Sequence, residues 1–93
     1  MILVGYTYRF VNCAGKSSTN SRLDDNMYCD AKAAAKTIWT ISHNITSFWY
    51  YDILKAEFHD TDTNTTWSVD GNGHTQRDYR SEATENFKSR WTQ

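Results

Sequence analysis

The sequence predicts an α+β domain in the order β-α-β-β-α, with the helices packed on one face of an antiparallel sheet. Two patterns predict this class. Apolar and polar residues alternate over residues 2–11, which is typical of a strand with one buried side, and apolar residues recur at helical spacing over residues 24–45. The chain has 93 residues, which suits one domain with one core. We therefore expect residues 1–93 to form a single small domain.

The first strand and the loop that follows it are predicted from residue type. The side chains that share one face of residues 2–11 are Ile2, Val4, Tyr6, Tyr8 and Phe10. β-branched and aromatic residues with a period of two indicate a strand. Residues 12–21 are rich in Gly, Ser, Asn and Thr, and this composition predicts a loop.

The first helix is predicted over residues 24–45. Its apolar stripe consists of Met27, Ala31, Ala34, Ile38, Ile41 and Ile45. Asp24, Asp25 and Asp30 lie toward its N-terminal end, where negative charge favours the helix dipole. The run AKAAAK adds high helix propensity. We expect Ile38 and Ile41 to face the sheet.

Two strands and a second helix are predicted in the remaining half of the chain. Residues 48–59 alternate, with Leu54, Ala56 and Phe58 on one face and Lys55, Glu57 and His59 on the other. Residues 65–69 predict a third strand that points Trp67 and Val69 inward. A helix is predicted from near Thr75, with Tyr79, Ala83, Phe87 and Trp91 on one side.

The segment DTDTNTTWSVDGNG, residues 60–73, resembles a calcium loop at its start. Asp60, Asp62 and Asn64 match the first three ligand positions of an EF-hand, but Thr65 replaces the required Gly and Gly71 replaces the bidentate Glu. Turn residues between two alternating runs explain the same composition. We therefore interpret the segment as an acidic hairpin turn, with calcium binding as the alternative.

No other motif predicts a cofactor or a metal. The segment GKSS, residues 15–18, lacks the Gly that a phosphate-binding loop has five residues earlier, where this chain has Phe10. The three histidines have no metal-ligand spacing with one another or with Cys13 and Cys29. We expect neither a metal nor a cofactor.

One set of residues could be catalytic. If the first two strands are neighbours, Arg9, Glu57 and His59 project from the same sheet face, close to Lys55 and Tyr51. A cation, a carboxylate and an imidazole can cleave RNA by general acid–base catalysis without a metal. The interpretation that we favour is a solvated strand face with paired charges.

Charge and targeting signals limit the partners and the location. The net charge is −1, and residues 48–73 carry five acidic groups against Lys55, which speaks against direct nucleic-acid binding. The sequence has neither a run of about 18 apolar residues nor a basic segment before an apolar one. We expect a cytoplasmic protein with reduced cysteines.

These features predict a non-catalytic binding module that inhibits or modulates a partner protein. Aromatic residues make up 15% of the chain, more than a small core usually hides. We expect Trp49 and Tyr51 to contribute to the interface, and Asp60, Asp62 and Asp70 to meet a basic, nucleic-acid-binding surface. A homodimer through the aromatic strand is also expected.

The composition resembles that of small accessory proteins of bacteriophages, anti-CRISPR proteins among them. The chain is short, has no proline and is rich in Asn, Thr and aromatic residues. The resemblance implies an inhibitor of host defence in the host cytoplasm, and it transfers no site residue. Two alternatives stay open: the ribonuclease-like enzyme described above, and a protein that sequesters a nucleotide between aromatic rings at a subunit interface.

Overall fold

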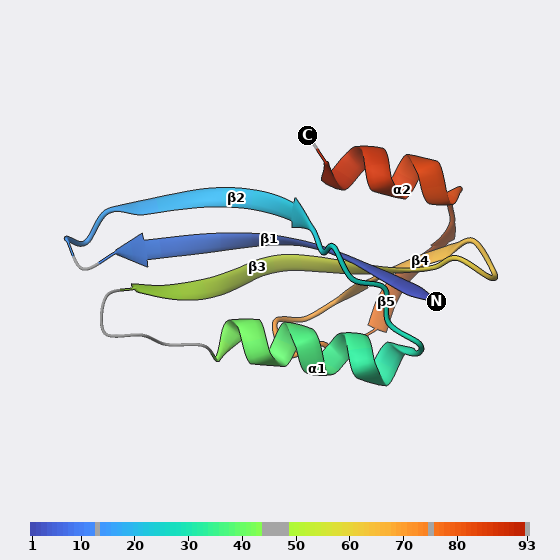
Figure 1. The fold of residues 1–93 in the computed structure, drawn as a ribbon, viewed down its shortest axis with the longest axis horizontal. Helices are drawn as coiled ribbons and strands as arrows, with labels where there is room; N and C mark the ends of the chain where they lie inside the picture. Colours follow the sequence, from blue (N-terminus) through green and yellow to red (C-terminus); the bar gives the residue numbers. More distant parts are fainter. Residues whose placement is uncertain (13, 44–48, 75, 93) are drawn as a thin grey trace.

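A computed structural model describes residues 1–12, 14–43, 49–74 and 76–92 of the chain. The elements follow in the order β1 (Ile2–Asn12), β2 (Ser17–Leu23), α1 (Ala31–Ser42), β3 (Trp49–Asp60), β4 (Thr65–Val69), β5 (Gln76–Ser81) and α2 (Thr84–Trp91). The strands of this described part form one antiparallel sheet in the order β2-β1-β3-β4-β5 (Figure 1). The α+β class and the antiparallel sheet are thus confirmed.

The structure adds two strands to the predicted order. β2 occupies residues 17–23, of which residues 17–21 were expected to be in a loop, and β5 occupies residues 76–81, which were expected to begin the second helix. Both are edge strands, and nearly all of their residues are exposed. An edge strand that is exposed on both faces needs no apolar alternation, so neither strand had a sequence signal.

A β-bulge divides β3 into two halves. Thr7 pairs with Lys55 and Tyr8 pairs with Ile53, so Leu54 is the extra residue. The bulge reverses which face successive residues occupy, and Ile53 packs on the same core as Ala56 and Phe58. Leu54, which was expected to face inward with Ala56 and Phe58, is 52% exposed.

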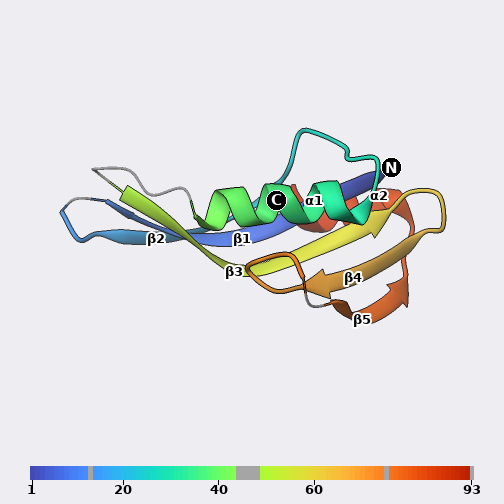
Figure 2. The same ribbon diagram turned by 90° about the horizontal axis from the view of Figure 1, so that it is seen from below.

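α1 covers one face of the sheet and closes the larger core. This core consists of Ile2, Val4, Tyr6, Ala34, Ile38, Ala56, Phe58, Trp67 and Val69. Ile38 is fully buried and Ile41 packs against the cluster, so the predicted helix stripe is confirmed over this part. Figure 2 shows α1 lying across the sheet in front of β1.

α1 begins at Ala31 rather than at Asp24. Asp30 is its N-cap, with Oδ1 accepting the backbone N–H of Ala33 at 2.8 Å. The residues before it bond to β1 beyond the end of β2. The N–H of Asp24 donates to the carbonyl of Val4, and Tyr28 exchanges two backbone hydrogen bonds with Ile2. These bonds satisfy edge groups of β1 that a longer helix would leave without partners.

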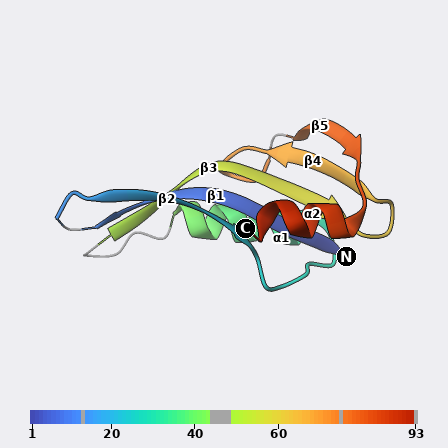
Figure 3. The ribbon, with the colours of Figure 1, turned by 90° about the horizontal axis from the view of Figure 1, so that it is seen from above.

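α2 covers the opposite face. Its buried residues, Phe87 and Trp91, pack with Leu3, which alternates along β1 with the residues that face α1. Gly5 makes this packing possible, because a Cβ atom there would lie 2.3 Å from the Trp91 ring. Figure 3 shows α2 in front with α1 partly behind it. The helices therefore lie on two faces of the sheet, where one shared face was expected.

The second helix is shorter than expected. Tyr79, which was placed on its inner stripe, belongs to β5 and is exposed, with its ring stacked on Trp67 at a centroid distance of 5.5 Å. Neither α1, with 12 residues, nor α2, with 8, is long enough to cross a membrane.

Candidate functional site

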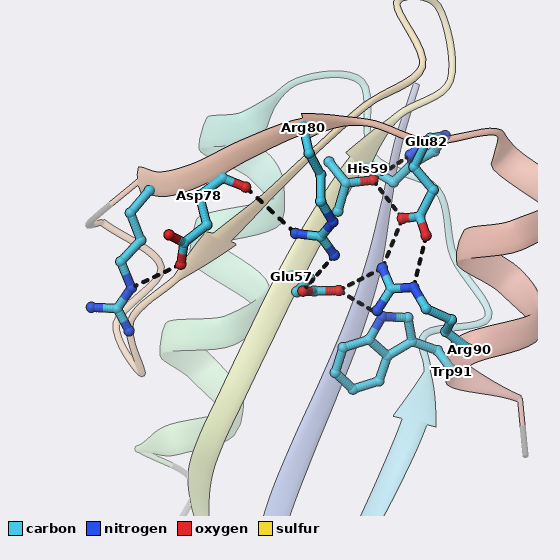
Figure 4. Close-up of polar contacts among 9 residues, drawn as sticks. Glu57, His59, Asp78, Arg80, Glu82, Arg90 and Trp91 are labelled. Atoms are coloured by element: carbon cyan, nitrogen blue, oxygen red, sulfur yellow. Dashed lines mark hydrogen bonds and ion pairs between the residues drawn. The ribbon is translucent and has the colours of Figure 1, made fainter.

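Glu57 is at the centre of a polar cluster on the α2 face. It lies in β3, and its side chain is 3% exposed. Oε2 accepts a hydrogen bond from Nη2 of Arg80 at 2.8 Å. Oε1 accepts hydrogen bonds from Nη2 of Arg90 at 2.8 Å and from Nε1 of Trp91 at 3.2 Å (Figure 4). A strand residue thus receives donors from β5 and α2, more than 20 positions later in the chain.

The two arginines keep this buried carboxyl ionised. Burial by itself raises the pKa of Glu57, but the hydrogen bonds and positive charges of Arg80 and Arg90 outweigh burial and lower the pKa. A buried carboxylate with two guanidinium donors is a charge-assisted contact.

Glu82 extends the cluster on the other side of Arg90. Its Oε2 accepts Nε of Arg90 at 2.7 Å and its Oε1 accepts Nη2 at 2.7 Å, so the contact is bidentate. Oε1 also accepts the hydroxyl of Thr66 at 2.9 Å. The hydrogen bonds from Arg90 are the main cause of the lowered pKa of Glu82, and the same contact raises the pKa of Arg90.

His59 lies beside this ion pair and is fully buried. Its Nδ1 is 2.8 Å from Oγ1 of Thr66, and its Nε2 is 2.9 Å from Oγ1 of Thr84. Because the Thr66 hydroxyl donates to Glu82, it accepts from Nδ1–H of the imidazole. The ring stacks on Phe87 at a centroid distance of 5.1 Å. Burial lowers the pKa of His59, which favours the neutral ring. The Thr84 hydroxyl beside Nε2 also contacts Oδ1 of Asn64 at 3.3 Å.

These contacts hold α2 on the sheet. We call Glu57, His59, Arg80, Glu82, Arg90 and Trp91 the α2 cluster. Each of the two carboxylates accepts at least three hydrogen bonds from protein groups, and both imidazole nitrogens contact a hydroxyl. The groups that could act on a substrate therefore bind one another under α2, and the arrangement acts as an anchor.

Arg9 is not in this cluster. Gly5 is the strand partner of Glu57, whereas Arg9 lies four residues further along β1 and pairs with Asp52. The Arg9 guanidinium contacts the Asp52 carboxylate at 3.0 Å, and both side chains are partly exposed. Glu57 and His59 were predicted to share this face and belong to the α2 cluster. Lys55, which was also predicted there, lies near the cluster, with Nζ 6.0 Å from the centre of the Trp91 ring. The ribonuclease-like alternative stays a prediction.

The acidic segment forms two turns at opposite ends of β4. Asp60 and Asp62 lie at the β3–β4 turn, where Oδ1 of Asp60 accepts the N–H of Asp62 at 2.9 Å. Asp70 begins the β4–β5 turn, and its Oδ1 accepts the N–H groups of Asn72 and His74 at 2.9 and 3.0 Å. The hairpin interpretation is confirmed, but β4 separates Asp70 from the other two acids. Among the described residues, no three His, Cys, Asp or Glu side chains are grouped so that they could hold a metal ion.

Trp49 and Tyr51 begin β3, opposite Asn12 and Phe10 of β1. Their side chains lie outside the part that the structure describes, as does Cys13. Cys29 carries an exposed free thiol.

A groove that was not predicted lies between α1 and the segment around the β4–β5 turn. We call it the α1 groove. It has a volume of about 830 Å³, and its lining includes Lys32, Lys36, Trp39, Gly73, His74 and Gln76. Gly73 fits closely against the helix, because a Cβ atom there would lie 2.7 Å from Cα of Ala35.

The arginine partners and the groove could not be derived from periodicity. A carboxylate between Ala56 and Phe58 indicates that a partner is needed, since an unpaired buried charge is very unfavourable. Nothing in the spacing says that residues 80 and 90 supply it, because 23 and 33 positions separate them from Glu57. The groove depends on the approach of a turn to α1, which local patterns do not specify.

Searches for similar proteins found no match: no family model, no curated protein and no solved structure is similar to the chain.

Proposed function

We propose that this protein is a non-catalytic binding module, which inhibits or modulates a partner protein by occupying its surface. The observation that carries the proposal is the exposed β3–β4 turn. Figure 1 shows the turn projecting beyond both helices at one end of the molecule. The side chain of Asp62 at this turn is 82% exposed, whereas Glu57 and Glu82 are paired with arginines under α2.

Exposed carboxylates on a projecting turn attract a basic surface. Each exposed ion pair is weak, but like charges on one projection steer the approach of a partner and speed its association. Asp62 lies 3.2 Å from the amino group of Met1, whose positive charge reduces the negative potential of the turn. Asp60 is a second carboxylate at this turn and increases the negative potential. We propose a partner with a basic surface, such as a protein that itself binds nucleic acid.

The class of inhibitor is proposed from composition. The resemblance to small phage accessory proteins supports a modulator of host defence that acts in the host cytoplasm. The acidic turn supports the same class, because defence proteins that act on nucleic acid need basic grooves.

Charge-neutral variants test the proposal. The protein is immobilised, a partner is captured from a lysate of the native host, and the captured protein is purified for kinetics. We expect Asp60→Asn with Asp62→Asn to slow association several-fold at low salt and to flatten its salt dependence. Asn keeps the side-chain oxygen that accepts the N–H of residue 62, so melting should be unchanged.

Asp70→Asn is the matched control. It also removes a carboxylate at a turn and keeps the acceptor oxygen, but at the opposite end of β4. We expect it to bind like the parent. The proposal of electrostatic docking is contradicted if the double variant binds as fast as the parent at low salt.

A further inference from the structure

We propose that the α1 groove is a binding site for a nucleotide, in which Trp39 stacks on the base while Lys32 and Lys36 contact the phosphate. This surface is separate from the β3–β4 turn, and the inference does not depend on the function proposed above. It also differs from nucleotide binding at a subunit interface, because one chain supplies the groove.

The size and walls of the groove fit a small ligand. Its volume of about 830 Å³ lies within the range of small-molecule sites. Ala31 and Ala35 line the helix side, where their short side chains leave room, and Gly73 begins the opposite wall. Gly73 has a φ of 77°, so glycine suits both the turn and the close approach to α1.

Trp39 provides an aromatic platform. Trp39 is 47% exposed, although a large apolar residue is normally covered. The ring stacks on His43 at a centroid distance of 4.1 Å and an interplanar angle of 17°. His43 is itself held, because its Nδ1 lies 2.8 Å from the carbonyl oxygen of Trp39. A ring that is already held loses little rotamer entropy when a base stacks on it.

Two lysines make the groove attractive to anions. Lys32, Lys36 and Trp39 are spaced by four and three residues, so they lie along one side of α1. Within the described part of the chain, neither lysine forms an ion pair with a carboxylate. Asp30 also lines the groove, but its carboxylate accepts the N–H of Ala33 at the start of the helix. The start of α1 adds a partial positive charge.

The indole of Trp39 and the two lysines together favour a ligand that has both a planar ring and an anionic group. An inorganic anion would leave the alanine and indole surface without a partner, and an apolar peptide would remove water from two ammonium groups without replacing it. A nucleotide has a planar ring for the indole and a phosphate for the lysines. Lys32 is seven residues from Trp39, which is about 10 Å along a helix and comparable to the length of a nucleotide.

The first experiment measures which parts of the ligand are needed. Adenosine monophosphate is titrated into the full chain by isothermal calorimetry at low salt, beside adenosine and ribose 5-phosphate. We expect the nucleotide to bind roughly tenfold or more tightly than either fragment, as for one stacked base together with a charged contact. Equal binding of the nucleotide and ribose 5-phosphate would overturn the proposal, since the ring would then contribute nothing.

Variants locate the site. Trp39→Ala, and Lys32→Gln with Lys36→Gln, should each weaken nucleotide binding by about tenfold. The matched control is Lys16→Gln with Lys88→Gln, which removes the same charge away from the groove and should bind like the parent. Unchanged binding by both test variants would overturn the proposal. Melting curves show whether each variant is folded.

A second measurement reports on the groove directly. Cys29 lines it and is exposed, so bound nucleotide should slow alkylation of this thiol. Peptide mapping separates Cys29 from Cys13. Saturating nucleotide that leaves the alkylation rate of Cys29 unchanged would place any binding elsewhere and contradict the assignment.

Discussion

At the scale of single residues, Glu57 explains how a charged side chain is accommodated under a helix. Removing a carboxylate from water is unfavourable by several kcal/mol, and only good geometry with further hydrogen bonds compensates for it. Glu57 has both, because two arginines and the Trp91 indole donate to it. The guanidinium groups are partly exposed, so their outer nitrogens can still reach water.

Replacing Glu57 should therefore destabilise the fold. Glu57→Gln keeps the shape but removes the charge and sets an amide nitrogen against guanidinium donors. We expect a loss of about 2–4 kcal/mol in the free energy of unfolding, at or just below the range for a broken buried ion pair because the arginines can be rehydrated. Urea unfolding measures it. Glu85→Gln, at an exposed position, should change stability by less than about 0.5 kcal/mol. A similarly small effect at residue 57 would contradict the anchoring role.

The lowered pKa values predict two pH windows. Burial lowers the pKa of His59 from 6.5, so as the pH falls the imidazole is protonated in the unfolded chain at a higher pH than in the folded protein. Stability should be full above pH 6.5 and fall as the pH drops below it toward the folded-state pKa. The pKa values of Glu57 and Glu82 are lowered from 4.5, so a second loss should follow below pH 4.5.

Unfolding free energies measured in urea at successive pH values test both windows. His59→Gln should remove the slope in the upper window and retain the acidic one. Stability that rises as the pH falls below 6.5 would contradict the neutral, buried imidazole.

The ribonuclease-like alternative predicts that Arg9 is needed for RNA cleavage. Arg9 lies away from the α2 cluster and is partly exposed, so Arg9→Gln should leave stability within about 0.5 kcal/mol of the parent. If the parent cleaves a fluorogenic RNA without metal and Arg9→Gln does not, the alternative is supported over the binding module. No cleavage by the parent rejects it.

At the scale of elements, the strands and the helix that bury one face were predicted from the sequence. β1, β4 and the α1 stripe were predicted because the apolar period reports burial. β2 and β5 were not, because exposed edge strands have no such period. In β3, the bulge at Leu54 reverses the faces, and a bulge cannot be read from alternation that continues on both sides.

The contact between β1 and α2 can be tested at Gly5. Gly5→Ala places a methyl group within the Trp91 ring, and Trp91 must then move away from the sheet. We expect a loss of about 1–3 kcal/mol, as for overpacking, and faster amide hydrogen exchange in α2 than in α1. Gly71→Ala is the control, because its Cβ would meet Ile53 at an ordinary distance of 3.7 Å. Equal exchange in the two helices would contradict a local effect.

At the scale of the whole molecule, the chain forms an elongated body of 43 × 25 × 22 Å. The projecting β3–β4 turn and the α1 groove are separate surfaces, and the buried residues of the α2 cluster, Glu57, His59 and Trp91, lie where α2 contacts the sheet. Sequence reasoning placed Glu57 and His59 on one face, which is confirmed, because strand alternation is local. It did not find the arginine partners of Glu57, because those contacts join elements that are distant in the chain.

Self-association is a prediction at this scale. The aromatic start of β3 remains our candidate for a dimer contact, on the grounds of composition. We expect a dimer at micromolar concentration in sedimentation equilibrium, and Trp49→Ser should shift the protein to the monomer. A parent that stays monomeric at high concentration would contradict the dimer and leave this segment available to a foreign partner.

The packing of Trp91 against Gly5 has a consequence for folding during synthesis on the ribosome. The α1 face needs residues only as far as Val69, whereas the α2 face cannot close before residue 91 has emerged. Trp91 follows Glu57 by 34 positions, which ribosomes translate in roughly 2 to 7 s. Until residue 91 has been synthesised, the Glu57 carboxylate lacks the Trp91 donor and Leu3 lacks the ring of Trp91. The residues of the α1 face are therefore all synthesised before those of α2, and the second face stays exposed until residue 91 has left the ribosome.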